Sequence, residues 1–204
     1  MRGRGRGRGG EHARGGSVLT PGEVAYRDQE RRRTTEAIRR WGCLVMHVSD
    51  DVDCACCAAT GTTRAERRAR KPARRRSTRW KPAFSYTIGL HGIGHPELLV
   101  FGLDLEPARA LLTRLTHEVR DHGRDLVPGE VISGSVGDGR SLLVESLPNP
   151  ADILVQANNY YRRPDKGSVE ALQLSWPDPM GRWPGEPGCL VPASQQPRPG
   201  TFRA

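Results

Sequence analysis

The sequence is poor in the residues that build a core and in the segments that direct a chain to a membrane. Aromatic residues make up 5% and hydrophobic residues 36% of its 204 residues, which is low for a fully folded chain, so part of it should be unpacked. No apolar run approaches the roughly 18–20 residues of a membrane span. The first 30 residues also lack the apolar centre of a secretory signal. We therefore expect a cytoplasmic protein without a membrane partner, whose five cysteines are reduced thiols.

The sequence also lacks the short motifs of standard enzyme chemistry. It contains no Gly-x-x-x-x-Gly-Lys phosphate loop, no Gly-x-Ser-x-Gly nucleophile turn and no His-Glu-x-x-His. It has no Gly-x-Gly-x-x-Gly placed between a strand and a helix either. Such motifs position phosphates, nucleophiles and metals. Whether the protein is an enzyme, and which cofactor it would use, is left open by the sequence.

Lysine is nearly absent, and the basic charge is unevenly distributed. Of the 32 basic residues, only Lys71, Lys81 and Lys166 are lysines, and the others are arginines. A GC-rich genome and selection for guanidinium chemistry both explain this skew. The net charge is +9, but residues 1–82 carry a balance of +12 and residues 83–204 a balance of −3. The basic excess therefore lies outside most of the predicted domain.

Composition divides the chain into a domain and three attachments. Residues 1–22 form an Arg/Gly arm that is predicted to be disordered, because glycine loses much entropy on ordering and nothing apolar offsets it. Residues 49–82 are Cys- and Arg-rich and lack any periodic apolar face, which predicts a mobile insertion. Residues 188–204 are expected to be a loose tail. The remaining chain, 23–187, is predicted to be a single domain.

Hydrophobic periodicity predicts an α+β fold. Alternating apolar residues indicate strands, a stripe of leucines after Pro107 indicates a helix, and Gly137-Asp138-Gly139 indicates a hairpin turn. Because few β-α-β alternations occur, we expect a mostly antiparallel sheet with two to three helices. Helices are expected over 23–40, 106–122 and 149–162, and strands over 43–48, 84–88, 98–101, 131–133, 141–147 and 169–176.

Three separated motifs resemble those of a bacterial family, domain-of-unknown-function family 4262. They are Phe84-Ser85-Tyr86-Thr87-Ile88-Gly89-Leu90, Gly94-His95-Pro96-Glu97-Leu98, and Leu172-Gln173-Leu174-Ser175-Trp176-Pro177-Asp178 with Gly181 and Trp183-Pro184. The resemblance spans about residues 38–187, apart from the insertion. It implies no activity, cofactor or catalytic residue, because none is established for the family.

The loop 91–97 is the first candidate site. Its glycines allow close approach of a ligand, and a loop between buried strands often carries function. His95 and Glu97 are candidate catalytic residues, a base and its orienting partner, or metal ligands together with His91 and His47. The alternative is structural: the loop is a tight connection in which His95 bonds to backbone.

The turn 176–183 is the second candidate site. Trp176 and Trp183 beside Asp178 would form a recognition pocket, or Asp178 caps a turn while the tryptophans cover the core. We expect both segments to contribute to one pocket for a small molecule or a partner protein. The binding residues expected there are Tyr86, His91, His95, Glu97, Gln173, Trp176, Asp178 and Trp183.

The attachments supply two weaker candidates. Cys54, Cys56 and Cys57 are spaced like part of a metal site, but no second cysteine pair completes four ligands, so no metal is assigned. The arginines of residues 1–16 and 64–81 favour weak, salt-sensitive contact with nucleic acid. The sequence thus leaves three hypotheses: a binding or accessory domain, a hydrolase-like enzyme using His95 and Glu97, and a nucleic-acid-binding accessory protein.

Overall fold

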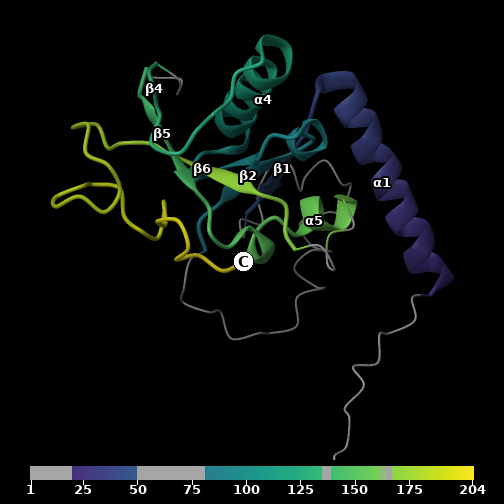
Figure 1. The fold of residues 1–204 in the computed structure, drawn as a ribbon. Coiled ribbons are helices and arrows are strands. Elements are labelled where there is room, and N and C mark those ends of the chain that lie inside the picture. The colour runs from purple at the N-terminus through teal and green to yellow at the C-terminus, as the bar shows by residue number, and fades with distance from the viewer. Residues whose placement is uncertain (1–19, 50–80, 135–138, 162, 164–166) are drawn as a thin grey trace, which may run out of the picture.

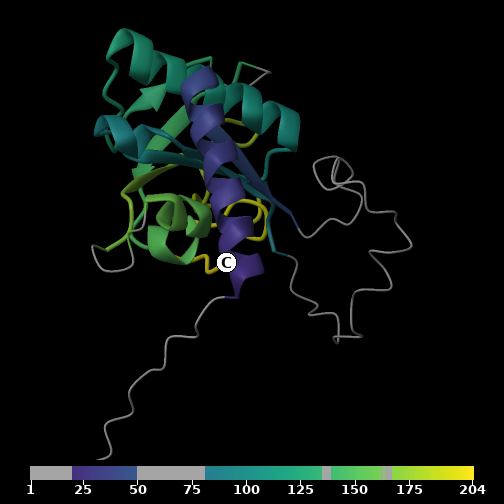
Figure 2. The same ribbon diagram turned by 90° about the vertical axis from the view of Figure 1, so that its right-hand side faces the viewer.

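A six-stranded sheet organises the chain in the computed structural model, which describes residues 20–49, 81–134, 139–161, 163 and 167–204. The strand order is β1-β2-β3-β6-β5-β4. Helix α4 covers one face of the sheet, α5 and the C-terminal residues lie on the other, and α1 flanks the β1 edge (Figures 1 and 2). The described elements form one α+β domain with three α-helices and a mostly antiparallel sheet, which confirms the predicted fold class.

Helix α1 (Pro21–Trp41) has strong signals at both ends. The Thr20 hydroxyl accepts a hydrogen bond from the Glu23 amide while Glu23 accepts one from the Thr20 amide, so this capping box satisfies N–H groups that lack helical partners. Gly42 ends the helix in the left-handed conformation. The cap at Thr20 explains why the helix starts two residues before the predicted residue 23.

Three strands form the first half of the sheet. Strands β1 (Leu44–Val48), β2 (Phe84–Ile88) and β3 (Glu97–Phe101) pair antiparallel in sequence order. Every residue of β3 is buried, because both faces of this strand are covered. The strand lies in the interior of the sheet, between β2 and β6.

The second half of the sheet joins the first through one parallel pair. Strand β6 (Ala171–Ser175) pairs parallel with β3, from Glu97 opposite Ala171 to Val100 opposite Leu174. On its other side β6 pairs antiparallel with β5 (Leu142–Ser146), which in turn pairs with β4 (Val131–Ile132). The parallel β3–β6 pair determines at which end of the sheet each motif lies.

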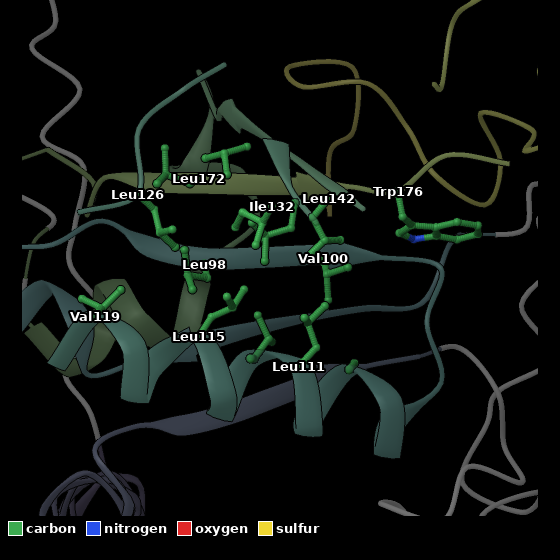
Figure 3. Packing of buried hydrophobic residues seen from close by; sticks show 14 of the residues in the cluster. Leu98, Val100, Leu111, Leu115, Val119, Leu126, Ile132, Leu142, Leu172 and Trp176 are labelled. Carbon is green, nitrogen blue, oxygen red and sulfur yellow. The ribbon is translucent and has the colours of Figure 1, made fainter. Parts of the chain in front are cut away.

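Helix α4 (Leu105–His122) builds the larger core. Leu111, Leu115 and Val119 recur at helical spacing, and they point from the helix toward the sheet in Figure 3. There they pack against apolar side chains of β3, β4, β5 and β6, among them Leu98 and Leu172. The predicted leucine stripe therefore faces the core.

A second core lies on the opposite face and includes the C-terminal residues. Helix α5 (Val155–Tyr161), preceded by the short helix η2 (Pro150–Asp152), covers part of this face. The Phe202 ring packs edge-on against Phe84 and Phe101, with centroids 5.5 and 5.1 Å apart. The expectation of a loose tail over 188–204 is therefore wrong: this segment supplies an aromatic side chain that covers the sheet.

The other two attachments fall largely outside the described residues. Of the arm 1–22, only residues 20–22 are described, and they form the start of α1. Of the insertion 49–82, residues 50–80 lie outside the description. In the part of the chain that is described, no helix is long and apolar enough to cross a membrane.

Truncation of the Phe202 ring tests the C-terminal packing. We expect Phe202→Ala to lower the free energy of unfolding by about 1–2 kcal/mol, because a half-buried ring loses its contacts with two core aromatics. Urea unfolding followed by circular dichroism measures the loss. Leu190→Ala, at a side chain that is 67% exposed, is the control and should change stability by less than about 0.5 kcal/mol. Equal effects of the two substitutions would contradict the packing of this segment.

Candidate functional site

The two family-like motifs lie at opposite ends of the sheet. The loop 91–97 leads into the start of β3, whereas the turn 176–183 follows the end of β6. Because β3 and β6 run parallel, the start of one strand is about 16 Å, the length of five residues, from the end of the other. The expected pocket shared by these two segments is therefore wrong.

At the first end, Glu97 is a fully buried carboxylate that holds a turn together. Its Oε1 accepts hydrogen bonds from the backbone N–H groups of Gly89 and His91, at 2.9 and 3.1 Å. Its Oε2 accepts from the Thr87 hydroxyl at 2.6 Å and the Leu90 amide at 3.3 Å. The carboxylate thus binds the amides at the start of η1 (Leu90–Ile93), which have no partner inside that short helix.

The environment of Glu97 is that of a structural anion. Burial raises the pKa of Glu97, although the hydrogen bonds from Thr87 and from three amides act in the opposite direction. The Tyr161 hydroxyl lies 3.4 Å from its Oε1. With its oxygens occupied by donors from its own turn, Glu97 is not positioned to orient a catalytic histidine.

Gly89 shows how tightly this turn packs. Its φ of 152° is rare for a residue with a side chain, and a Cβ there would lie 2.7 Å from the Gly42 carbonyl oxygen. The turn therefore sits directly against the end of α1, and the glycine is needed for this close approach.

His95 is buried, and both of its ring nitrogens contact backbone. Nδ1 lies 2.7 Å from the Pro96 carbonyl oxygen, which requires the proton on Nδ1, and Nε2 then accepts from the Leu126 amide at 3.3 Å. A general base needs access to its substrate. This arrangement argues against the hydrolase hypothesis and matches the structural alternative for the loop.

His91, in the same loop, is half-buried. Its ring packs edge-on against Tyr161, with centroids 4.7 Å apart. Burial and the nearby Arg163 charge lower the pKa of His91, whereas Glu170 acts in the opposite direction. Burial also raises the pKa of Tyr161, so at neutral pH both side chains are uncharged.

At the second end, Trp176 and Asp178 stabilise the turn that follows β6. The Trp176 indole N–H donates to the Phe101 carbonyl at 3.0 Å, and the Gln196 amide pairs with both backbone groups of Trp176. Asp178 accepts hydrogen bonds from the backbone of Met180, Arg182 and Leu190 and pairs with the Arg182 guanidinium at 3.0 Å. Burial alone would raise the pKa of Asp178, but the bonds from Leu190 and Arg182 lower it to about 2.

The remaining expected binding residues are dispersed. The Tyr86 hydroxyl is buried and accepts from the Gln156 amide, and burial raises the pKa of Tyr86 to about 12. Gln173 is buried beneath the C-terminal segment and donates to the Pro197 carbonyl at 2.7 Å. Trp183 is half-buried, and its amide donates to Glu186.

No metal centre forms among the described residues. Cys54, Cys56 and Cys57 lie outside the described residues. The two segments expected to contact nucleic acid, 1–16 and 64–81, also lie outside them, except for Lys81. Within the described ranges, no group of three or more His, Cys, Asp or Glu side chains could hold a metal ion. His47 lies near the far end of β1, where its Nδ1 is 2.8 Å from the buried Ser85 hydroxyl, so it does not join His91 or His95.

Sequence reasoning missed a groove that lies between α1, α5 and the β1 edge. Its volume is about 850 Å³. Leu44 and Met46 of β1 and Ile88 of β2 line it from the sheet, and Gln156, Asn159 and Tyr160 line it from α5. Residues of α1 between 22 and 34 form the opposite wall. Since these segments are far apart in the chain, no local sequence pattern reveals the groove.

Replacement of Glu97 tests its structural role. We expect Glu97→Gln to lower the free energy of unfolding by about 2–4 kcal/mol, because the new NH₂ group would face N–H donors that the carboxylate now accepts. Urea unfolding measures this loss. Glu170→Gln, at an exposed carboxylate near the same end of the sheet, is the control and should have little effect. A neutral outcome for Glu97→Gln would refute the anchoring role.

Acid unfolding tests Asp178. Its folded pKa of about 2 lies below the ordinary value of 3.8, so its contribution to stability is present above about pH 4 and is lost as the pH falls toward 2. Asp178→Asn should remove this part of the pH dependence and reduce stability at neutral pH. Unfolding midpoints measured between pH 2 and 7 check this, with Asp28→Asn at an exposed position of α1 as control. An unchanged slope between pH 4 and 2 in Asp178→Asn would count against it.

Comparison with known proteins adds one result. No curated protein and no solved structure matches the chain. A family model described as "Domain of unknown function (DUF4262)" matches residues 37–190. This range includes all six strands, both sheet ends and helices α4 and α5. The chain therefore belongs to the DUF4262 family.

Proposed function

We propose that this protein is a binding domain whose ligand site is the groove between α1, α5 and the β1 edge. The proposal rests on the groove itself, which has an apolar floor from the sheet and walls of mixed polarity from α1 and α5. Ligand sites are concave, predominantly apolar and supplied with a few polar groups that orient the ligand. The volume of about 850 Å³ falls within the usual range of such sites.

The floor of the groove offers apolar surface that is not fully covered. Leu44 and Met46 project from the same face of β1 because side chains alternate along a strand, and both are half-buried. Leu44 is paired with Ile88 across the β1–β2 ladder. A ligand that covers these side chains would gain stability from removing them from water.

The walls of the groove are held in place by contacts between α1 and α5. The Arg31 guanidinium donates to the Tyr160 carbonyl at 2.9 Å and lies over the Tyr160 ring, 5.4 Å from its centroid. The Thr35 and Tyr160 hydroxyls are 3.1 Å apart. These contacts fix α1 at its middle, so the groove is a preformed part of the fold.

The composition of α1 explains why the groove is open. In its C-terminal half Thr34 and Ala37 are buried and Ile38 packs against the second core. In its N-terminal half the groove-lining positions include the charged residues Arg27 and Glu30. Charged side chains keep their water unless they are paired, so this half of α1 does not close onto the sheet.

Two further points concern the extent of the family match and the location of the protein in the cell. Residues 22–36 of α1, which form one wall of the groove, lie outside the range that the family model matches. A cytoplasmic location is also proposed, and the reduced thiols of Cys43 and Cys189 agree with it.

Binding of a fluorescent amphiphile tests the groove. The probe is 8-anilinonaphthalene-1-sulfonate, which fluoresces in apolar sites and whose sulfonate suits the Arg27 and Arg31 side chains. We expect the folded full-length protein to bind it, and Met46→Glu to weaken binding by about tenfold or more, because a carboxylate enters the apolar floor.

The matched control is Val131→Glu on β4, at the opposite edge of the sheet, where the side chain is 51% exposed. Circular dichroism melting checks that each variant is folded. Absence of dye binding by the native protein, or equal binding by wild type and Met46→Glu, would overturn the proposed site.

A further inference from the structure

We infer that the occupant of the groove is an extended peptide segment of a partner protein, which pairs with β1 as an added strand. This inference rests on the proposed function and specifies its ligand. It follows from the position of β1 in the sheet, the alternation of its side chains and the helix alongside it.

Strand β1 is an edge of the sheet. It stands first in the strand order, and in the described part of the chain its ladder partner is β2 alone. Every second residue of an edge strand directs its N–H and C=O groups away from the sheet, and these groups can pair with another chain. Four of the five β1 residues are only half-buried and Val48 is exposed, whereas every residue of β2 and β3 is buried.

The groove lies beside this edge, and Figure 2 shows α1 running in front of the β1 side of the sheet. An extended peptide can add to a sheet as a further strand at an exposed edge. Backbone hydrogen bonds then supply affinity, and pockets for alternate side chains supply specificity.

The lining of the groove indicates the peptide's chemistry. Side chains on one face of the added strand would cover Leu44 and Met46 and should be apolar. The α1 residues Arg27, Asp28 and Glu30 line the same hollow as Leu44 and Met46, so these peptide side chains would also meet charges of both signs. The alternate peptide side chains would lie beside Val45 and His47 on the other face of the sheet. The expected ligand therefore carries an apolar residue at every second position.

Two other occupants fit less well. A small molecule would leave the outward-facing backbone of β1 unpaired. A second copy of this chain would have to bring its own β1 edge to this one, and each copy carries an α1 alongside that edge. A separate peptide brings no second α1 helix to this edge, and its backbone N–H and C=O groups would pair with the outward-facing groups of β1.

The test uses the full-length chain and a phage-displayed library of random linear nonapeptides. We expect enrichment of sequences that carry an apolar residue at every second position. A synthetic peptide of the enriched sequence is then N-methylated at one amide at a time, and affinity is measured by fluorescence anisotropy. Methylation at every second amide should weaken binding by about tenfold, because it removes a hydrogen bond to β1, while the intervening amides should tolerate it.

Three further results decide the outcome. Met46→Glu should abolish peptide binding while Val131→Glu retains it, and the peptide should displace the dye from the groove. Binding that is insensitive to methylation at all amides, helicity of the bound peptide, or no enriched sequence would overturn the added strand. If the dye still binds in a Met46-dependent way, the groove stands as the ligand site and only the peptide is refuted. If dye binding also fails, both proposals fall.

Discussion

The parallel pairing of β3 with β6 is the constraint on which the arrangement of the molecule depends. It joins a three-stranded antiparallel unit, β1-β2-β3, to a second one, β6-β5-β4. Because the two central strands run in the same direction, the loop before β3 and the turn after β6 are held at opposite ends of the sheet. The two candidate segments, 91–97 and 176–183, are thereby separated and cannot form one site.

Each of these segments is built around a carboxylate that accepts hydrogen bonds from backbone amides. Glu97 binds three amides of the η1 turn, and Asp178 binds three amides of the turn after β6. A buried amide without a partner is costly, so these acids stabilise turns that have no regular ladder. The two environments differ: Asp178 also has the Arg182 guanidinium and keeps a low pKa, whereas burial raises the pKa of Glu97.

Periodicity predicted the elements of the fold well, because local spacing reports which face of a strand or helix is buried. The leucine stripe of α4 and the apolar β3 are examples. The site was predicted less well. His95 and Glu97 are residue types that serve in catalysis as well as in structure. Here they form hydrogen bonds with the backbone of Leu126 and Pro96 and with the η1 amides, and these bonds depend on tertiary structure that sequence spacing does not report.

The C-terminal segment and the groove were missed for a related reason. Proline and glycine indicate that a segment lacks regular structure, not that it lacks contacts, and Phe202 is anchored among aromatic side chains. The groove combines α1, two strands and α5, which lie more than 100 residues apart at the extremes. No local sequence pattern marks it, although two exposed apolar side chains of α1, Val24 and Tyr26, line it.

The proposed function as a peptide-binding domain requires that the β1 edge is open. Amide hydrogen exchange of residues 44–48 in the full-length protein tests this requirement most directly. An open edge predicts that amides bonded to β2 exchange slowly and that the intervening, outward-facing amides exchange rapidly in the free protein. The outward amides should become protected when the groove is filled by a peptide strand. Slow exchange of every β1 amide in the free protein would show that the edge is already covered, and would contradict the account of the groove as a peptide-binding site.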